Sequence, residues 1–314
     1  MPGKIYKYFG PQVSDLVFSD VGAALKCSLP KNFNDPYELF LTVDFSSDPS
    51  ALACYQELIG RIPQLPTTCF SVSPAVSPMW AHYGLNASGF VVEFDENELI
   101  DLFPESKFDD VRYQDKADDG LTEMLYRAHV IGKPRYTYFL QSGTFYAAYF
   151  TKATCWSYEM ERRMVADMAE VRVSNDLLLL EVPKSCITSI IAGAKSCEDL
   201  KNSLKARADS FDCAFYNMQI GRTTITPYFL DGYGATCIFN GDEIVLAQCS
   251  CESCREPIPE GNEKCSWCQI TDEHRYEAAI RNPYRMLDRI GHLDSYIKSM
   301  DGITERLNKG RKKS

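Results

Sequence analysis

Alternating apolar and polar positions predict four short strands in the first hundred residues. KIYKYFG alternates along its length, and in TTCFSVSP the apolar Phe70 and Val72 alternate with smaller and polar residues. ALKCSL and GFVVEFD have the same strand character, with proline or polar turn residues near their ends. The predicted strands are 4–10, 24–29, 67–74 and 89–95.

Apolar side chains at helical spacing mark three further segments. SPMWAHYG at 77–84 predicts a short helix with Ser77 as its N-cap and a proline at the first helical position. Residues 121–152 carry apolar residues at helical spacing, which predicts a helix there. SCEDLKNSLKARADS begins with Ser196 and Asp199 in capping-box spacing, so it also predicts a helix.

The order of these elements predicts an α+β fold. Later strands are predicted at 176–183, 187–193, 213–220 and 235–240. Strands and helices follow one another without regular βαβ alternation, which favours mixed or antiparallel sheets with helices. The expected organisation is a main domain over 1–248, a small unit at 249–271 and a C-terminal helix with a basic tail at 272–314.

Composition and charge narrow the class of protein. The 314 residues are 45% hydrophobic and 24% charged, which is ordinary for a globular protein. No apolar run approaches the ~20 residues that span a bilayer, and no signal peptide is evident, so we expect a cytoplasmic protein without a membrane partner. The net charge of −10 disfavours wholesale binding of nucleic acid. Acids concentrate at 94–120, interpreted as a solvated insertion, and the basic block at 308–314 is interpreted as a disordered tail.

Four of the thirteen cysteines form the most specific local motif in the chain. CESCREPIPEGNEKCSWC contains two C-x2-C pairs, and two such knuckles predict a tetrahedral structural zinc site. Every ligand position is a cysteine, so no coordination site is left open for catalysis. The expected ligands are Cys251, Cys254, Cys265 and Cys268. Such a zinc ribbon either stabilises the chain or recognises a partner, including nucleic acid, and the ribbon and the basic tail are the candidate surfaces.

The C-terminal segment carries one apolar helix face. Its residues are spaced by three and four positions, which predicts packing against the main domain or, alternatively, a homodimer contact. The residues of this face are Ile290, Leu293, Ile297, Met300 and Leu307.

CWSYEMERRM at 155–164 contains Glu159 and Glu161, and its pattern fits two structures. On a strand both carboxylates share one face with Arg163 and converge on a candidate site. On a helix Trp156 begins a buried stripe with period four, and Glu159 forms a surface ion pair with Arg163. Periodicity alone does not decide between the two.

Five segments in order resemble a bacterial family catalogued as domain of unknown function 2971. They are YKYFG near the start, KNFNDPYE at 31–38, TCFSVS at 68–73, PMWAHYGLNASGFVVEFD at 78–95 and KATCWSYEMERR at 152–163. The resemblance spans about residues 4–230, and the zinc ribbon lies outside it. The family implies no activity, but it includes the two glutamates and thus favours a site there.

The order of a first strand, a serine-containing strand, an aromatic helix and Glu-x-Glu is also similar to the ADP-ribosyltransferase layout. That similarity implies split sheets that bind NAD, with Glu161 as the ribose-binding catalytic acid and Glu159 as its helper. Lys7 stands where those enzymes have His or Arg. The cofactor-binding residues implied are Lys7, Tyr8, Asn34, Ser71, Trp80, His82, Tyr83 and Arg163.

The sequence therefore supports three functional hypotheses. The first is an NAD-using ADP-ribosyltransferase-like enzyme, such as a bacterial defence or toxin-type effector acting on an unidentified macromolecular acceptor. The second is a non-enzymatic zinc-ribbon module that binds a protein or a nucleic acid. The third is a Mg²⁺-dependent nuclease that uses the carboxylates of Asp35, Glu38 and Glu159.

Overall fold

The computed structural model describes residues 3–33, 35, 41–60 and 62–311. Contacts divide the chain into two compact units, Met1–Gln248 and Cys249–Ser314. The first unit contains the sheets and the second contains the four-cysteine motif. Within the described residues, no helix combines the length and apolarity needed to cross a membrane.

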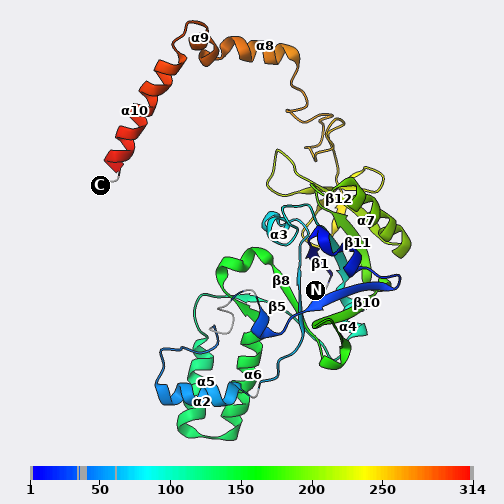
Figure 1. The fold of residues 1–314 in the computed structure, drawn as a ribbon, viewed down its shortest axis with the longest axis vertical. Helices are drawn as coiled ribbons and strands as arrows, with labels where there is room; N and C mark the ends of the chain where they lie inside the picture. Colours follow the sequence, from blue (N-terminus) through cyan, green and yellow to red (C-terminus); the bar gives the residue numbers. More distant parts are fainter. Residues whose placement is uncertain (1–2, 34, 36–40, 61, 312–314) are drawn as a thin grey trace. The chain divides into compact units, whose positions relative to one another are not determined.

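A ten-stranded mixed sheet is the centre of the first unit (Figure 1). All neighbouring strands run antiparallel except β11 and β12, which are parallel. In spatial order the strands are β15 (Ile244–Leu246), β14 (Thr236–Phe239), β13 (Tyr228–Asp231), β12 (Ala214–Gln219), β11 (Ile187–Ala192), β4 (Phe90–Asp95), β1 (Lys4–Phe9), β3 (Thr67–Ser71), β8 (Glu161–Val165) and β5 (Lys107–Asp110). The fold is thus α+β, as the order of predicted elements indicated.

A three-stranded sheet accompanies the large one. Its order is β2 (Gly22–Cys27), β10 (Leu177–Pro183) and β9 (Val171–Ser174), all antiparallel. A bridge between Ser28 and Thr67 joins the end of β2 to the start of β3. A separate parallel pair forms from β6 (Arg112–Tyr113) and β7 (Thr151–Lys152). The small sheet therefore reaches the large sheet at β3.

Side chains on the two faces of β1 enter different cores. Ile5 and Phe9 pack in a core that also contains Leu25 of β2 and strand residues of β10. Tyr6 packs on the opposite face with Trp80 of α3 (Ser77–His82). Because alternate strand residues point to opposite faces, this alternation buries β1 on both sides. Lys7 of the same strand is partly exposed and lines the cavity described below.

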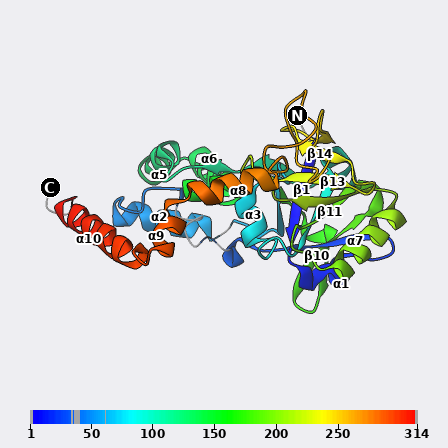
Figure 2. The ribbon, with the colours of Figure 1, turned by 90° about the horizontal axis from the view of Figure 1, so that it is seen from above.

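α7 (Glu198–Phe211) connects β11 and β12 in one βαβ unit and packs on both strands, and it lies along them in both views (Figures 1 and 2). The predicted capping box at its start does not form. The N-cap is Cys197, and the Ser196 hydroxyl instead donates to the carbonyls of Ser88 and Gly89. The predicted cap of α3 is also replaced, because Val76 is the N-cap and the Ser77 hydroxyl donates to the carbonyl of Ile225.

The helix predicted over 121–152 is two helices, α5 (Asp119–Ile131) and α6 (Pro134–Phe150). Gly132 adopts a left-handed conformation with φ 69°, and Pro134 begins the second helix, so the chain reverses between them. With α2 (Pro49–Ile59) the two helices form a small apolar core of their own (Figure 1).

The acidic stretch at 94–120 is not a solvated insertion throughout. It contains the end of β4, α4 (Glu96–Leu102) and β5, which pairs with β8. Glu96 is buried and accepts a hydrogen bond of 2.7 Å from Nε of Arg162. Part of this stretch therefore belongs to the core.

In the second unit, three helices follow the cysteine motif within the described residues 272–311. They are α8 (Asp272–Arg281), α9 (Pro283–Arg289) and α10 (Leu293–Arg311). Gly291, with φ 72°, lies between the last two. The predicted single C-terminal helix is therefore interrupted, and most of the predicted basic tail is helical through Arg311.

Candidate functional site

A split between β1 and β3 creates the candidate site. The two strands pair at one position only, Tyr6 with Ser71, although β3 pairs with β8 along its whole length. Lys7 extends across the split, and its Nζ donates hydrogen bonds of 2.8 Å to Oγ1 of Thr68 and to the carbonyl of Cys69. Because the ladder is open here, side chains from both faces of the sheet can line one space.

A cavity of 190 Å³ occupies this split. It is smaller than the roughly 300–1,000 Å³ of pockets that enclose a drug-sized ligand, so it fits one end of a larger molecule. The residues that line it are Tyr6, Lys7, Tyr8, Lys26, Ser28, Asn32, Phe33, Thr67, Thr68, Cys69, Phe70, Ser71, Met79, Tyr83, Lys152, Glu159, Glu161 and Arg163.

The Glu-x-Glu segment is neither a regular helix nor a continuous strand. Glu159 ends a 3-10 helix over Thr154–Glu159, and Glu161 begins β8. Between them Met160 adopts a left-handed conformation with φ 45°, which costs a non-glycine residue about 1–2 kcal/mol. Its carbonyl accepts from the backbone N–H of Val72, which fixes the turn against the chain just after β3. The turn brings both carboxylates to the cavity.

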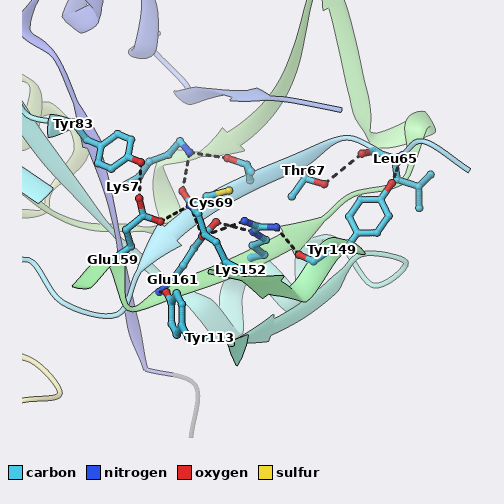
Figure 3. A network of polar contacts seen from close by, with 12 residues as sticks. Lys7, Leu65, Thr67, Cys69, Tyr83, Tyr113, Tyr149, Lys152, Glu159 and Glu161 are labelled. Atoms are coloured by element: carbon cyan, nitrogen blue, oxygen red, sulfur yellow. Dashed lines mark hydrogen bonds and ion pairs between the residues drawn. The ribbon is translucent and has the colours of Figure 1, made fainter. Parts of the chain in front are cut away.

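Two buried cations hold these carboxylates (Figure 3). Lys152 Nζ donates to Oε2 of Glu159 at 2.6 Å and to Oε2 of Glu161 at 3.4 Å. Arg163 donates from Nε and Nη2 to the two oxygens of Glu161, at 2.7 and 3.2 Å. Tyr83 completes the network with a hydrogen bond of 2.6 Å to Oε1 of Glu159. Among the described residues of this network, each carboxylate thus has a cationic partner, as buried charges require.

The surroundings move the pKa values of the two acids in opposite directions. Burial raises the pKa of Glu159, and Lys152 and Tyr83 oppose this effect only in part. Burial acts in the same direction on Glu161, but the adjacent Arg163 guanidinium, assisted by Lys152, outweighs it and lowers the pKa to about 2. Glu161 is therefore a carboxylate at neutral pH, whereas Glu159 binds a proton more readily than an ordinary glutamate.

Most of the residues expected at the site lie around this one cavity. β1, β3 and β8 are neighbours, and they supply Lys7, Tyr8, Ser71, Glu161 and Arg163. Tyr83 directly follows α3, and Glu159 ends the 3-10 helix. Two expected residues do not line it. Trp80 is buried and donates from Nε1 to the carbonyl of Pro74, and His82 is exposed with its ring near the Tyr158 hydroxyl. Asn34 lies outside the described residues.

Several lining residues were not among the residues expected at the site. Lys152, which holds both acids, lies in β7 directly after α6. Lys26 and Phe33 come from β2 and from the segment that follows it. The only hint in the sequence was a lysine inside an otherwise apolar strand. Strand pairing over long sequence separations brings these residues to the site, and local sequence patterns do not encode that pairing.

The carboxylates expected for a Mg²⁺ site do not form a cluster among the described residues. Asp35 is buried, Glu38 lies outside the described residues, and Glu159 is bound by Lys152 and Tyr83. Within the part of the chain that the structure describes, the four cysteines form the one group of three or more His, Cys, Asp or Glu residues close enough to share a metal ion.

These four cysteines meet the geometric demands of a metal centre. Their sulfur atoms all lie within 4.8 Å of one another, and Sγ of Cys254 lies 3.7 Å from Sγ of Cys265. A tetrahedral zinc site with bonds of about 2.3 Å has S–S edges of about 3.8 Å. Backbone N–H groups of the knuckles lower the pKa of Cys251 to about 6, whereas neighbouring sulfurs raise that of Cys268 to about 12. A bound cation would remove that mutual repulsion.

A family model described as "Protein of unknown function (DUF2971)" matches residues 79–164. This segment includes most of α3, both glutamates and Arg163, whereas Lys7 and Ser71 precede it. The match is shorter than the span of about 4–230 expected from the sequence. No curated protein and no solved structure matches the chain.

Proposed function

We propose that the first unit is an ADP-ribosyltransferase-like enzyme that breaks the bond between nicotinamide and ribose in NAD. One observation carries this proposal. Lys7, Ser71 and Glu161 stand on three neighbouring strands and line the same cavity at the split in the sheet. This arrangement supports the layout in which a first-strand cation, a serine and a late glutamate surround the nicotinamide ribose.

The unequal pKa values of the two acids support a division of labour between them. A pair of acids whose surroundings separate their pKa values commonly marks the two roles in such chemistry. Glu161 stays ionised and would stabilise the positive charge that develops on the ribose as the C–N bond breaks. Glu159, with its raised pKa, would accept the proton of the attacking hydroxyl.

The reaction balances with these groups alone. The electron pair of the C–N bond leaves with nicotinamide, and a lone pair of the acceptor oxygen forms the new bond to the ribose carbon. The acceptor proton passes to Glu159. Water as acceptor gives ADP-ribose, and a side chain of another macromolecule gives ADP-ribosylation, which fits a role as an effector.

Nicotinamide release from NAD, with and without a cell lysate as a source of acceptors, tests this proposal. Glu159→Gln keeps the size of the side chain and one of its two acceptor oxygens but cannot take the proton, so we expect release to fall about 10²-fold or more. Glu198→Gln, on the exposed start of α7, is the matched control and should release at the wild-type rate. Melting temperatures of all three proteins must be compared first.

Tyr83→Phe provides a second variant that leaves every charge in place. It removes one hydrogen bond that opposes the raised pKa of Glu159, so the acid side of the pH profile should shift to higher pH. Equal release by wild type and Glu159→Gln, with an unshifted profile for Tyr83→Phe, would contradict the roles assigned here.

We further propose that the four cysteines bind a structural zinc ion. All four ligand positions are thiols, which leaves no place for a substrate or water at the metal.

The rival function is a binding module based on the second unit. Trp267, between two cysteine ligands in sequence, is 62% exposed, and a large exposed aromatic residue of this kind is common at interfaces. A protein, a nucleic acid or a second copy bound through the C-terminal helices would fit this alternative. Retention of an oligonucleotide or protein by residues 249–314 alone, with no NAD turnover by the full chain, would favour it.

A further inference from the structure

Counted over the residues that the structure describes, the charges of the side chains that line the cavity do not sum to zero. Four lysine or arginine side chains and two glutamate side chains reach it. Among the described residues, Lys152 and Arg163 form ion pairs with Glu159 and Glu161, so the charges of these four groups offset one another. Lys7 and Lys26 are the two cations that remain.

Neither of these lysines forms an ion pair with a carboxylate among the described residues. Lys7 donates only to the neutral oxygens of Thr68 and Cys69 and lies 5.3 Å from the centre of the Phe70 ring. Lys26 is exposed on β2, between two buried residues. Burial lowers the pKa of Lys7; Cys69, Cys27 and the Glu161 carboxylate oppose this effect, and repulsion from Lys26 adds to it. Both lysines line the same cavity.

Two cations that line one cavity, and that form no ion pair within the described part of the chain, favour an anion of two charges. We infer that Lys7 and Lys26 form an anion subsite of this cavity and that its ligand carries a phosphate or pyrophosphate group. The polar residues Ser28, Asn32 and Thr68 line the same cavity and can donate further hydrogen bonds to oxygen atoms. A compact anion that contacts both ammonium groups gains from both charges at once.

The small volume of the cavity indicates that only part of such a ligand lies inside it. A space of 190 Å³ is smaller than the roughly 300–1,000 Å³ of pockets that enclose a drug-sized ligand, so it does not enclose a whole dinucleotide. The exposed Lys26 therefore lies at the opening, where the diphosphate of NAD would lie with the nicotinamide ribose inside. This identification of the diphosphate rests on the proposed function, whereas anion binding by the two lysines does not.

Calorimetric titration of the full chain with inorganic pyrophosphate tests the subsite directly. We expect binding that weakens about tenfold or more in Lys26→Gln, because one charge-assisted contact is lost. Lys31→Gln, an exposed lysine five residues along the chain that does not line the cavity, is the matched control and should bind as wild type. Lys26 is exposed, so unchanged melting temperatures are expected for both variants.

Other ligands distinguish the sources of the phosphate. ADP-ribose should bind more tightly than pyrophosphate and lose affinity in Lys26→Gln, whereas nicotinamide riboside, which lacks phosphate, should be insensitive to this change. Absence of pyrophosphate binding, or equal losses in Lys26→Gln and Lys31→Gln, would overturn the inference. Binding of oligonucleotides but not of pyrophosphate or ADP-ribose would also overturn it. Pyrophosphate binding without nicotinamide release would keep the subsite and reject the proposed reaction.

Discussion

Replacing Glu161 with glutamine should destabilise the first unit by about 3 kcal/mol at pH 7. Glu161 is 5% exposed and binds Arg163, which is 1% exposed, through both of its oxygens. Its pKa of about 2, against an ordinary value of 4.5, corresponds to about 3 kcal/mol at about 1.4 kcal/mol per pH unit. Breaking a buried ion pair by removing one partner costs a similar 3–5 kcal/mol or so.

The pH dependence of this loss follows from the sign of the shift. Because folding lowers the pKa, the stabilisation is complete above the unfolded value near 4.5 and is lost as pH falls toward about 2. At pH 3.5 only about 2 kcal/mol of it should remain. The stability difference between wild type and Glu161→Gln should therefore narrow between pH 5 and pH 3.

Urea titration of the full chain, followed by far-ultraviolet circular dichroism, measures this difference. With a slope of about 3 kcal/mol per molar urea, a loss of about 3 kcal/mol lowers the midpoint by about 1 M. Glu181→Gln is the matched control, since it breaks an exposed pair with Arg172 and should cost under about 1 kcal/mol. Equal costs for the two substitutions, or a difference independent of pH, would refute the buried ion-pair account.

Two further predictions concern other parts of the chain. Elemental analysis should find one zinc ion per chain, and Cys251→Ser should release it and unfold the cysteine unit while the first unit keeps its melting transition; clearly less than half a zinc ion per wild-type chain would contradict the site. Gly132→Ala should cost about 1 kcal/mol in the free energy of unfolding, because φ 69° strains alanine although no atom lies within 4 Å of the added Cβ; an unchanged unfolding midpoint would disagree with this turn.

Local patterns in the sequence located most strands and the cysteine motif. β1, β4, β10 and β11 lie where alternating or continuous apolar residues predicted strands. Such patterns arise because each strand buries at least one face. The paired C-x2-C spacing likewise fixes which sulfurs can meet, because each pair is a tight local knuckle. Such features depend on residues within a few positions of one another.

The helix caps show where local patterns fail. Ser77 and Ser196 have the residue type of an N-cap, but their hydroxyls donate to carbonyls at Ile225 and at Ser88 and Gly89. A carbonyl acceptor at long sequence separation competes for the serine hydroxyl, and the sequence alone does not reveal this acceptor.

The candidate site could be predicted only in part for the same reason. The spacing of Glu159 and Glu161 fitted two periodicities, and the left-handed turn at Met160 satisfies neither. Which cations hold these acids depends on where α6 and β8 bring Lys152 and Arg163.

The most direct test of the account is a structure of the full chain determined with NAD at saturating concentration. We predict that the nicotinamide ribose lies in the split between β1 and β3, with its hydroxyls within hydrogen-bonding distance of Glu161 and its diphosphate beside Lys7 and Lys26. An empty cavity at saturating NAD, or NAD bound elsewhere on the chain, would contradict the proposed function.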